Sequence, residues 1–321
     1  MNVLGIDIGG TSIKGAVIND KGVIFDRFQL DVNKLDTPEY TVGELCKIIN
    51  NLINDKKYNE PLSGIGIGTP GIIDYEKGII LSSPNLPTWS MFKIKDFIYD
   101  RVHLPIEINN DANLAALGES TFGSGKEYNN MVMLTLGTGV GSGIIINKKI
   151  YDGNKHQGAE IGHMVIKNNG RLCGCGRRGC LEAYASASAL IKITQEEIIK
   201  HPGSLMNDVI KELGKCDARA PFIAAKKDDK VAKRIVNRYV RDLSEGILNI
   251  CNIFRPEAII LSGGVANEGE YLLTKIKRYV KKHHYGMLNS PVVDIKSASL
   301  GYDSGKIGAA ALILQSIKSI K

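Results

Sequence analysis

Two glycine-rich segments, 128 residues apart, resemble each other and constrain the fold more than any other feature of this sequence. DIGGTSIKGAVIN at Asp7 to Asn19 aligns with TLGTGVGSGIIIN at Thr135 to Asn147. In each segment an apolar strand enters a Gly/Thr-rich turn and a second apolar strand leaves it, which predicts a hairpin whose turn needs glycine dihedrals. Glycine-rich hairpins can also resemble each other by chance. The repeat nevertheless leads us to expect two similar halves.

Strand-like and helix-like patterns alternate around these hairpins. Apolar spacing predicts helices at 41–52, 229–254 and 305–320, and strands at 63–68, 106–109 and 258–264. This mixture is typical of an α/β protein, and 321 residues with 43% hydrophobic content suffice for two domains. We expect a small N-terminal domain, 1–117 plus 304–321, and a large C-terminal domain, 118–303. Pro84 to Pro87 and Gly123 to Gly125 are the expected loops or hinges.

Composition and charge exclude several classes of protein. The apolar runs are strand-length, far below the roughly 20 residues of a membrane span, and the N-terminus carries no charged leader, so we expect a cytoplasmic protein. The net charge is +7, but the lysines are dispersed. The densest basic stretch, Lys275 to His284, fits a solvated helix end better than a nucleic-acid interface. We therefore expect no nucleic-acid or membrane partner.

Three glycine-rich turns together suggest an ATP site. Asp7 ends a strand before the first turn and can hold Mg²⁺, while backbone amides freed by glycines can approach phosphate oxygens. A tight turn alone explains any single one of the three, so their joint occurrence carries the hypothesis. The candidate cofactor-binding residues are Asp7, Gly9, Gly10, Thr11, Lys14, Gly137, Thr138, Gly139, Gly263 and Gly264.

Other nucleotide motifs are absent or weak. The sequence contains no GxxxxGK[ST] motif of a P-loop. Gly66, Gly68 and Gly71 match GxGxxG after a strand, but a proline and turn residues stand where a Rossmann helix would begin. A Rossmann-type site is therefore rejected.

Short polar side chains form a candidate sugar-binding set. Asp111 stands where a strand ends and a helix begins, and it is either the N-cap of that helix or a general base that takes a proton from a hydroxyl group. The residues alone do not choose between the two. Asn110 beside it, Asn85 in a proline-bounded loop, Glu160 and Glu182 can bind several sugar hydroxyls.

One histidine and three cysteines have the spacing of a metal site. Cys173, Cys175 and Cys180 lie within eight residues, whereas the other three cysteines stand alone, which disfavours a disulfide framework. With His163 they would make the Cys₃His set typical of structural zinc. A lone histidine is more often an ordinary side chain, so His163 is the weakest member. Four protein ligands would close the site and make it structural.

The motifs DIGGT, TPG, SPNL, NNDAN, LGTGVGSG, AEIGH, CGCGRRGCLE and LSGG occur in the order found in the ROK family of sugar kinases and repressors. The sequence resembles the glucokinase-type members over nearly its whole length. The resemblance implies an actin-like, hexokinase-type fold with two ribonuclease-H-like domains around a cleft. It also implies a homodimer and a role in carbohydrate metabolism at the entry of glycolysis.

Carried over position by position, the resemblance makes Asp111 the catalytic base. Asn110, Glu160, His163 and Glu182 match the family's sugar-binding positions, with Gly71 and Asn85 lining the same pocket. His163 would use one ring nitrogen for zinc and the other for the sugar.

The expected reaction is phosphoryl transfer from Mg-ATP to the 6-hydroxyl of glucose. Similar proteins use N-acetylmannosamine, N-acetylglucosamine, fructose or allose, so the sugar stays open. Only six residues precede Asp7, which leaves no room for the helix-turn-helix of the family's repressors. A non-catalytic sugar sensor is the remaining alternative, although a pure binder would need neither Asp7 nor Asp111.

Overall fold

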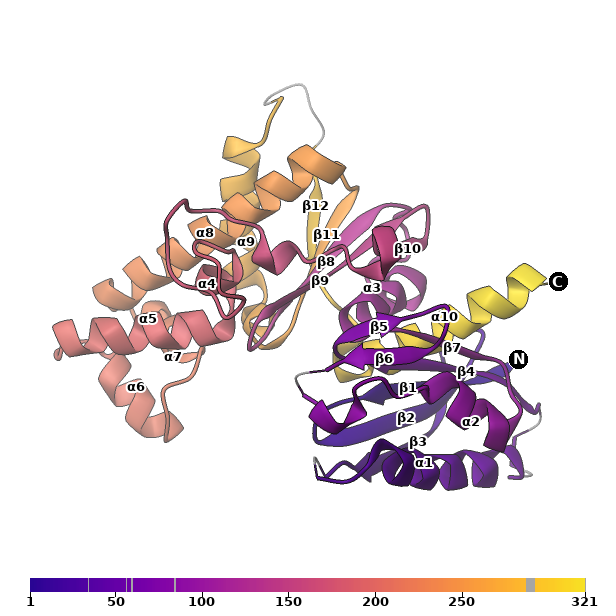
Figure 1. The fold of residues 1–321 in the computed structure, drawn as a ribbon. Helices are drawn as coiled ribbons and strands as arrows, with labels where there is room; N and C mark the ends of the chain where they lie inside the picture. The colour runs from indigo at the N-terminus through magenta and orange to yellow at the C-terminus, as the bar shows by residue number, and fades with distance from the viewer. Residues whose placement is uncertain (34, 56, 59, 84, 287–291, 321) are drawn as a thin grey trace. The chain divides into compact units, whose positions relative to one another are not determined.

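The computed structural model describes residues 1–33, 35–55, 57–58, 60–83, 85–286 and 292–320 (Figure 1). Pro84, the first residue of one expected hinge, lies outside the described residues. The chain divides into two compact units. Unit 1 contains 1–129, 143–159 and 299–321, and unit 2 contains 130–142 and 160–298.

These boundaries differ from the expected 1–117 plus 304–321. The helix that begins at Asp111 continues to Phe122, and its fully buried Glu119 accepts hydrogen bonds from the backbone amides of Ser299 (2.9 Å) and Leu300 (2.8 Å). Lys148 donates to the carbonyl oxygen of Lys126 at 2.7 Å. These contacts hold the residues after 117, the 143–159 segment and the residues from 299 onward in unit 1.

The strands are β1 (Asn2–Ile8), β2 (Ser12–Asn19), β3 (Ile24–Asp31), β4 (Leu62–Thr69), β5 (Ile72–Asp74), β6 (Ile79–Ser82), β7 (Ile106–Asn110), β8 (Met131–Leu136), β9 (Val140–Ile146), β10 (Lys149–Tyr151), β11 (Ala258–Ser262) and β12 (Asp294–Ser297). The α-helices are α1 (Pro38–Ile53), α2 (Ile94–Val102), α3 (Asp111–Phe122), α4 (Glu182–Ala185), α5 (Ala187–Lys200), α6 (Met206–Leu213), α7 (Ala220–Lys226), α8 (Lys230–Phe254), α9 (Glu270–His283) and α10 (Ser304–Ile320). The 3₁₀ helices are η1 (Pro87–Trp89), η2 (Asn154–His156), η3 (Ile161–His163), η4 (Gly264–Glu268) and η6 (Gly301–Asp303). Every element expected from periodicity is present, with ends that differ by a few residues.

The two large sheets have the same topology. The first has the order β3-β2-β1-β4-β7 and the second the order β10-β9-β8-β11-β12. In each, a hairpin supplies the central strand, β1 or β8. The next strand, β4 or β11, pairs with the central strand in parallel, and the last strand, β7 or β12, pairs in parallel with β4 or β11. The equivalent strands β1 and β8 carry the two segments that align in the sequence, so the expected repeat corresponds to a structural repeat.

Alternation along β1 decides which residues can reach the site in unit 1. Leu4 and Ile6 belong to the core cluster that includes residues of α1 and α2, whereas Val3 packs with residues of α10. Gly5 faces α10 so closely that a Cβ atom there would clash with the Lys306 carbonyl. Asp7, two residues further, therefore also faces α10.

The helices α1 and α8 begin at ordinary N-cap residues. Thr37 caps α1 and accepts a hydrogen bond from the Tyr40 amide, with Pro38 at the first helical position. Asp229 caps the long helix α8 and accepts from the Ala232 amide at 2.7 Å. Local sequence therefore determines where these helices begin.

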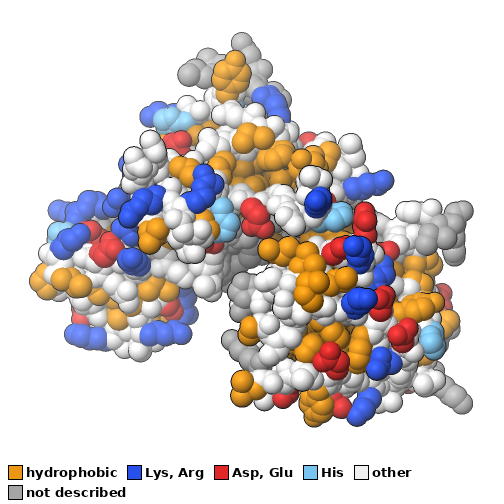
Figure 2. All heavy atoms as spheres, in the orientation of Figure 1, with side chains coloured by type: hydrophobic (Ala, Val, Ile, Leu, Met, Phe, Trp, Pro, Cys, Tyr) orange, Lys and Arg blue, Asp and Glu red, His pale blue; other side chains and the backbone are white. Residues whose placement is uncertain are grey.

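The surface is mixed in charge. On the face drawn in Figure 2, Lys and Arg side chains are interspersed with Asp and Glu side chains. No helix among the described residues combines the length and apolar character needed to cross a membrane.

Candidate functional site

Asp7 is the penultimate residue of β1 and lies beside the N-terminus of α10. A Cβ atom built on Gly305 would lie 3.1 Å from Asp7 Oδ2, so glycine lets the helix start approach the carboxylate. Burial, and then the charge of Asp111, raise the pKa of Asp7, while Lys306 and Lys14 lower it. An acid in this setting gains from a bound cation, which supports the expectation that Asp7 holds Mg²⁺.

The first glycine-rich turn lies next to the Asn85 loop. The Gly9 amide donates to the Ser12 carbonyl at 2.9 Å and closes the turn between β1 and β2. A Cβ atom on Gly10 would lie 3.2 Å from Asn85 Cβ. Thr11, Lys14 and Asn85 are exposed. The structure thus brings together a predicted phosphate turn and a predicted sugar residue.

Gly71 occupies a conformation that requires glycine. Its φ is +109°, and a Cβ atom there would clash with the carbonyl of Ser82 and lie 2.9 Å from Ser83 Cα. The loop after β4 is therefore packed directly against the end of β6.

Asn110 and Asp111 mark the change from β7 to α3. Asn110 is the N-cap, and its Oδ1 accepts from the Ala112 amide at 2.9 Å. The N-cap interpretation of Asp111 is therefore wrong, because Asp111 is the first residue of the helix, although its Oδ1 also accepts from Ala112 at 2.8 Å. Capping does not explain why this position is acidic.

The two acids of unit 1 lie near each other. Asp7 pairs with Gly68 in the parallel register, and a Cβ atom on Gly68 would lie 3.9 Å from Asp111 Cα. The Asp111 side chain reaches solvent, yet the protein atoms around its carboxylate partly desolvate it and raise its pKa. A raised carboxyl pKa is the usual tuning of a general base.

In unit 2 the second glycine-rich turn is held by Glu182. Glu182 Oε2 accepts from the Val140 amide at 3.0 Å, and a Cβ atom on Gly139 would clash with the same carboxylate. The Gly137 carbonyl accepts from the Ala187 amide at 2.8 Å, while Thr138 is exposed at the tip. Glu182, predicted only as a sugar residue, therefore also supports a predicted phosphate turn.

The third glycine turn follows β11, next to the end of β8. Gly263 has a φ of +88°, and a Cβ atom there would lie 2.6 Å from the Leu136 carbonyl oxygen, whereas Gly264 has open space around it. Ser262 pairs with Thr135 in the parallel register. The two predicted glycine turns of unit 2 thus lie at the carboxyl ends of adjacent parallel strands, where α/β sheets commonly bind ligands.

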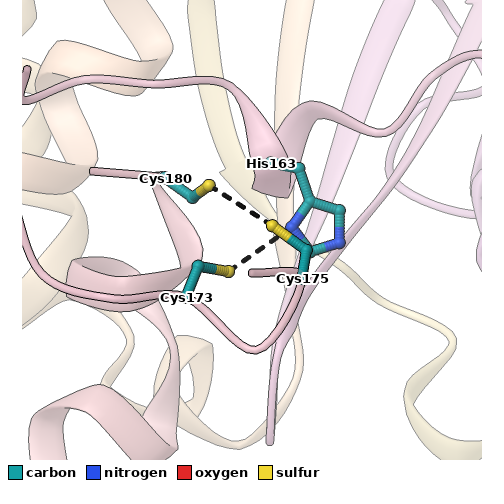
Figure 3. Close-up of side chains that lie close together, drawn as sticks. All are labelled: His163, Cys173, Cys175 and Cys180. Carbon is teal, nitrogen blue, oxygen red and sulfur yellow. Dashed lines mark hydrogen bonds between the residues drawn. The ribbon is translucent and has the colours of Figure 1, made fainter. Parts of the chain in front are cut away.

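The four predicted metal ligands converge in unit 2 (Figure 3). The ligand atoms of His163, Cys173, Cys175 and Cys180 all lie within 4.8 Å of one another. His163 Nδ1 is 3.6 Å from Cys173 Sγ, and Cys175 Sγ is 3.7 Å from Cys180 Sγ. A tetrahedral zinc ion with Zn–S of ~2.3 Å and Zn–N of ~2.0–2.1 Å has ligand edges of about 3.6 and 3.8 Å. The donor set and these distances fit zinc.

The backbone shapes the cysteine loop for this purpose. Gly176 and Gly179 have φ of +86° and +87°, and the Cys173 amide donates to the Arg177 carbonyl at 2.9 Å. The Arg177 amide lowers the pKa of the Cys175 thiol. The glycines in CGCGRRGC are thus turn residues that direct the thiols to one point.

Glu182 and Glu160 flank this cluster differently. Glu182 Oε1 accepts from the Cys173 thiol at 3.4 Å, so the carboxylate contacts the cluster and the glycine turn at once. Glu160 is exposed, and its carbonyl oxygen accepts from the His163 amide at 3.1 Å in η3. A cavity of about 500 Å³ borders Thr138, Cys173 and Glu182.

Sequence reasoning missed several polar residues in unit 1. The buried Lys306 lies 2.7 Å from Asp303 and faces Asp7. The side-chain amide of Asn113 donates to Oδ1 of the buried Asn109 at 3.0 Å, and Asn109 directly precedes Asn110. Lys306 could have been noticed in the sequence, because it is a lysine among the small and apolar residues of α10. The hydrogen bond of Asn109 is visible only in the three-dimensional structure.

Comparison with known proteins shows similarity over nearly the whole chain. A family model described as the ROK family matches residues 3–316. The glucokinase of Halalkalibacterium halodurans is 35% identical over 320 residues, 99% of this chain and 96% of that protein. The xylose repressor of Bacillus spizizenii is 32% identical over 317 residues, 97% of this chain and 77% of that protein.

Solved structures are similar to this chain as well. The structure of a ROK family glucokinase from Streptomyces griseus in complex with glucose and AMPPNP matches with a TM-score of 0.79 and 32% identity. The match covers 98% of this chain and 100% of that chain. The similarity therefore includes both the strand order and the segments that carry the candidate residues.

Proposed function

This protein belongs to the ROK family, and from that premise we propose that it phosphorylates the 6-hydroxyl group of glucose with ATP. It is an ATP-dependent sugar kinase with an actin-like fold. The observation that carries the proposal is the pair of acids, Asp7 and Asp111, at neighbouring strand ends of unit 1. A protein that only senses sugar would need neither acid.

We assign the chemistry to Asp111. Its carboxylate takes the proton of the sugar hydroxyl while the new O–P bond forms and the bond between the γ-phosphorus and the ADP oxygen breaks. Asp7 would hold Mg²⁺, directly or through water, and a bound Mg²⁺ would supply positive charge near the transferred group. The Gly9–Thr11 and Gly137–Gly139 turns supply backbone amides for the phosphates, with Lys14, Gly263 and Gly264 completing the nucleotide set.

We assign sugar binding to the polar side chains of Asn85, Asn110, Asp111, Glu160, His163 and Glu182, with Gly71 lining the pocket. His163 directs Nδ1 toward the cysteines, which leaves Nε2 for a sugar hydroxyl. The zinc ion would do no chemistry and would fix the segment that carries His163 and Glu182.

The test of the base is Asp111→Asn, which keeps size and hydrogen-bonding atoms. We expect turnover to fall by roughly 10²- to 10⁴-fold, with glucose affinity by calorimetry retained. The exposed Asp208→Asn on α6 is the matched control and should keep full turnover. Near-normal turnover of Asp111→Asn would show that Asp111 is not the base.

The sugar is tested by a coupled ADP-release assay. Glucose should give the highest kcat/KM in a panel with N-acetylmannosamine, N-acetylglucosamine, fructose and allose. Another preferred sugar would change the substrate and keep the reaction, whereas activity with none of them would favour the sensor alternative. A homodimer and a cytoplasmic location stay predictions, and light scattering tests the first.

A further inference from the structure

An ion pair behind the cysteine loop (residues 171–180) has no role in the mechanism above. Lys167 Nζ lies 2.7 Å from Asp242 Oδ2 on α8, and it also lies 4.1 Å from the centroid of the Tyr184 ring on α4. The Asp242 side chain is only 2% exposed. Among the described residues, the second cation in contact with Asp242 is Arg241, whose Nε lies 3.4 Å from Oδ1. Lys167 is therefore the closer of the two cations that compensate this buried carboxylate.

The backbone of Lys167 holds the end of the cysteine loop that contains Cys180. The Lys167 amide donates to the Gly179 carbonyl at 3.2 Å, and the Ile166 amide donates to the same oxygen at 2.9 Å. A Cβ atom on Gly179 would clash with the Lys167 carbonyl oxygen, and Val165 forms an antiparallel bridge with Cys180. The position of Lys167 therefore sets the position of Cys180.

Tyr184 holds the other end of the loop. Its buried hydroxyl oxygen accepts a hydrogen bond from the Arg171 amide at 2.7 Å, two residues before Cys173. Tyr184 lies in α4, the short helix that begins with Glu182. An ammonium group over an aromatic ring is attracted to the ring face. The Lys167 ammonium thus connects the groups that hold both ends of the loop.

The middle of the cysteine loop has little packing of its own. Leu172 and the residues from 174 to 178 are exposed, whereas Cys173 and Cys180 near the two ends are buried. A segment with few buried contacts opens easily unless other contacts restrain it. The restraints at its two ends therefore decide how often the three thiols point to one place.

We propose that Lys167 and Asp242 are positioning residues for the Cys₃His cluster, and that Tyr184 supports them. Together they fix both ends of the cysteine loop in the metal-free protein. Less conformational entropy is then lost when four ligands close around a metal ion, which raises the affinity for the ion. The same contacts hold the helix that begins with Glu182. A consequence for sugar binding therefore follows, and this part alone rests on the proposed function.

Lys167→Met is the first test, because it removes the ammonium group and keeps the length of the side chain. We expect zinc affinity, measured by competition with a chelator of known affinity, to fall about tenfold. The KM for glucose should rise by a similar factor, with kcat and the KM for ATP close to wild type. The variant should also melt below wild type, because the buried Asp242 carboxylate keeps only Arg241 as a partner.

Lys167→Met combined with Asp242→Leu separates positioning from stability. Replacing both members of a buried ion pair by apolar residues often restores stability, so the double variant should melt close to wild type. Its zinc affinity should nevertheless stay about tenfold below wild type. If zinc affinity recovers together with the melting temperature, the pair only stabilises the fold and the inference is overturned.

Tyr184→Phe is a milder variant that tests the other end of the loop. It removes the hydroxyl that accepts from the Arg171 amide and keeps the ring beside Lys167. Zinc affinity should fall about fivefold, the effect of one hydrogen bond. This variant also tests the inference if Lys167→Met does not fold.

Lys226→Met is the matched control. Lys226 Nζ lies 2.6 Å from Glu268 Oε2 and 5.1 Å from the centroid of the Tyr271 ring, so it has the same kinds of partner on elements other than the cysteine loop. Its zinc affinity should equal that of wild type. Lys167→Arg keeps the positive charge and should retain most of the zinc affinity. An equal loss in Lys226→Met and Lys167→Met would contradict positioning by Lys167.

Wild-type zinc affinity in both Lys167→Met and Tyr184→Phe overturns the inference, and so does a wild-type protein that binds no zinc. These results are distinguishable from failure of the proposed function, because zinc affinity is measured without sugar or ATP. An active Asp111→Asn would remove the proposed base and leave the zinc result unchanged. Weaker zinc binding with an unchanged KM for glucose would remove only the consequence for sugar binding.

Discussion

The β1–β2 turn and the β8–β9 turn occupy the same place in two sheets of equal strand order, yet only the first follows an acid. Asp7 in β1 aligns with Thr135 in β8, and their parallel partners are Gly68 and Ser262. Unit 1 surrounds its turn with acids and a buried lysine, whereas unit 2 surrounds its turn with Glu182 and the Cys₃His cluster. The repeated fold provides two equivalent turns, and the side chains around each turn determine its function.

This contrast has an electrostatic basis. The pKa of Asp7 is raised chiefly by burial, so its ionised form is costly in the folded protein. Unit 2 keeps the corresponding position uncharged and uses the Glu182 carboxylate as a hydrogen-bond acceptor for the Val140 amide. We infer that unit 1 places charged side chains near its turn, whereas unit 2 holds its turn rigid through hydrogen bonds.

The largest expected effect comes from removing the charge at one turn. Asp7→Asn should lower kcat by about 10²- to 10³-fold, because the Mg²⁺ ligand is lost. Thr135→Val, at the equivalent position of unit 2, should cost less than about tenfold. Steady-state kinetics over a range of Mg²⁺ concentrations measures both. Equal reductions of kcat in the two variants would contradict the inference that the two turns have different roles.

The same variant should be more stable than wild type. A raised pKa means that ionised Asp7 destabilises the fold at neutral pH, and this penalty fades as pH falls through the folded-state pKa. Asp7→Asn should therefore melt above wild type at pH 7, and the difference should shrink toward acidic pH. A lower melting temperature at pH 7 would show that Asp7 stabilises the fold.

A smaller effect is expected from replacing a cysteine of the Cys₃His cluster in unit 2. Cys175→Ser should remove zinc and weaken sugar binding about 10- to 100-fold, because the segment with His163 and Glu182 loosens, with ATP affinity less affected. Elemental analysis and calorimetry measure these changes. Cys216→Ser, outside the cluster, is the control and should keep both. Absence of zinc in the wild-type protein would exclude the site.

The smallest effect concerns backbone geometry at the third turn. Gly263→Ala should cost about 1–3 kcal/mol of unfolding free energy, because its φ is +88° and the methyl group meets the Leu136 backbone. Gly264→Ala adds a methyl group in open space and should change stability little. Chemical denaturation of the two variants gives the comparison, and equal stability would show that the turn relaxes freely.

Local features of the sequence predicted much of this molecule. The predicted metal cluster could be recognised in the sequence because three of its candidate ligands fall within one tight loop, so their spacing in the chain limits the distances between them. The glycine turns could be predicted from their composition, but the expected glycine dihedral is present only at Gly263 among the predicted turn glycines. Gly10 and Gly139 have no positive φ and instead lie close to Asn85 and Glu182. The helices at 229–254 and 305–320 were readable because their apolar periodicity is long and regular.

Contacts between segments that are far apart in the chain could not be predicted from the sequence. Whether Asn110 or Asp111 caps α3 could not be predicted from the sequence, because only the backbone geometry decides it. The domain boundary shifted because Glu119, an ordinary helix residue in the sequence, is buried and bonded to Ser299 and Leu300.

The sequence by itself determined the repeated hairpins, the cysteine loop and the family, since each depends on residues that are close in the chain or on motif order. Only the tertiary structure decided that Asp7 faces the start of α10 and that Glu182 joins the cysteine cluster to the second turn. The physical reason is the same in each case. Side chains far apart in sequence meet only when strands and helices pack, and packing sets both their burial and their charge environment.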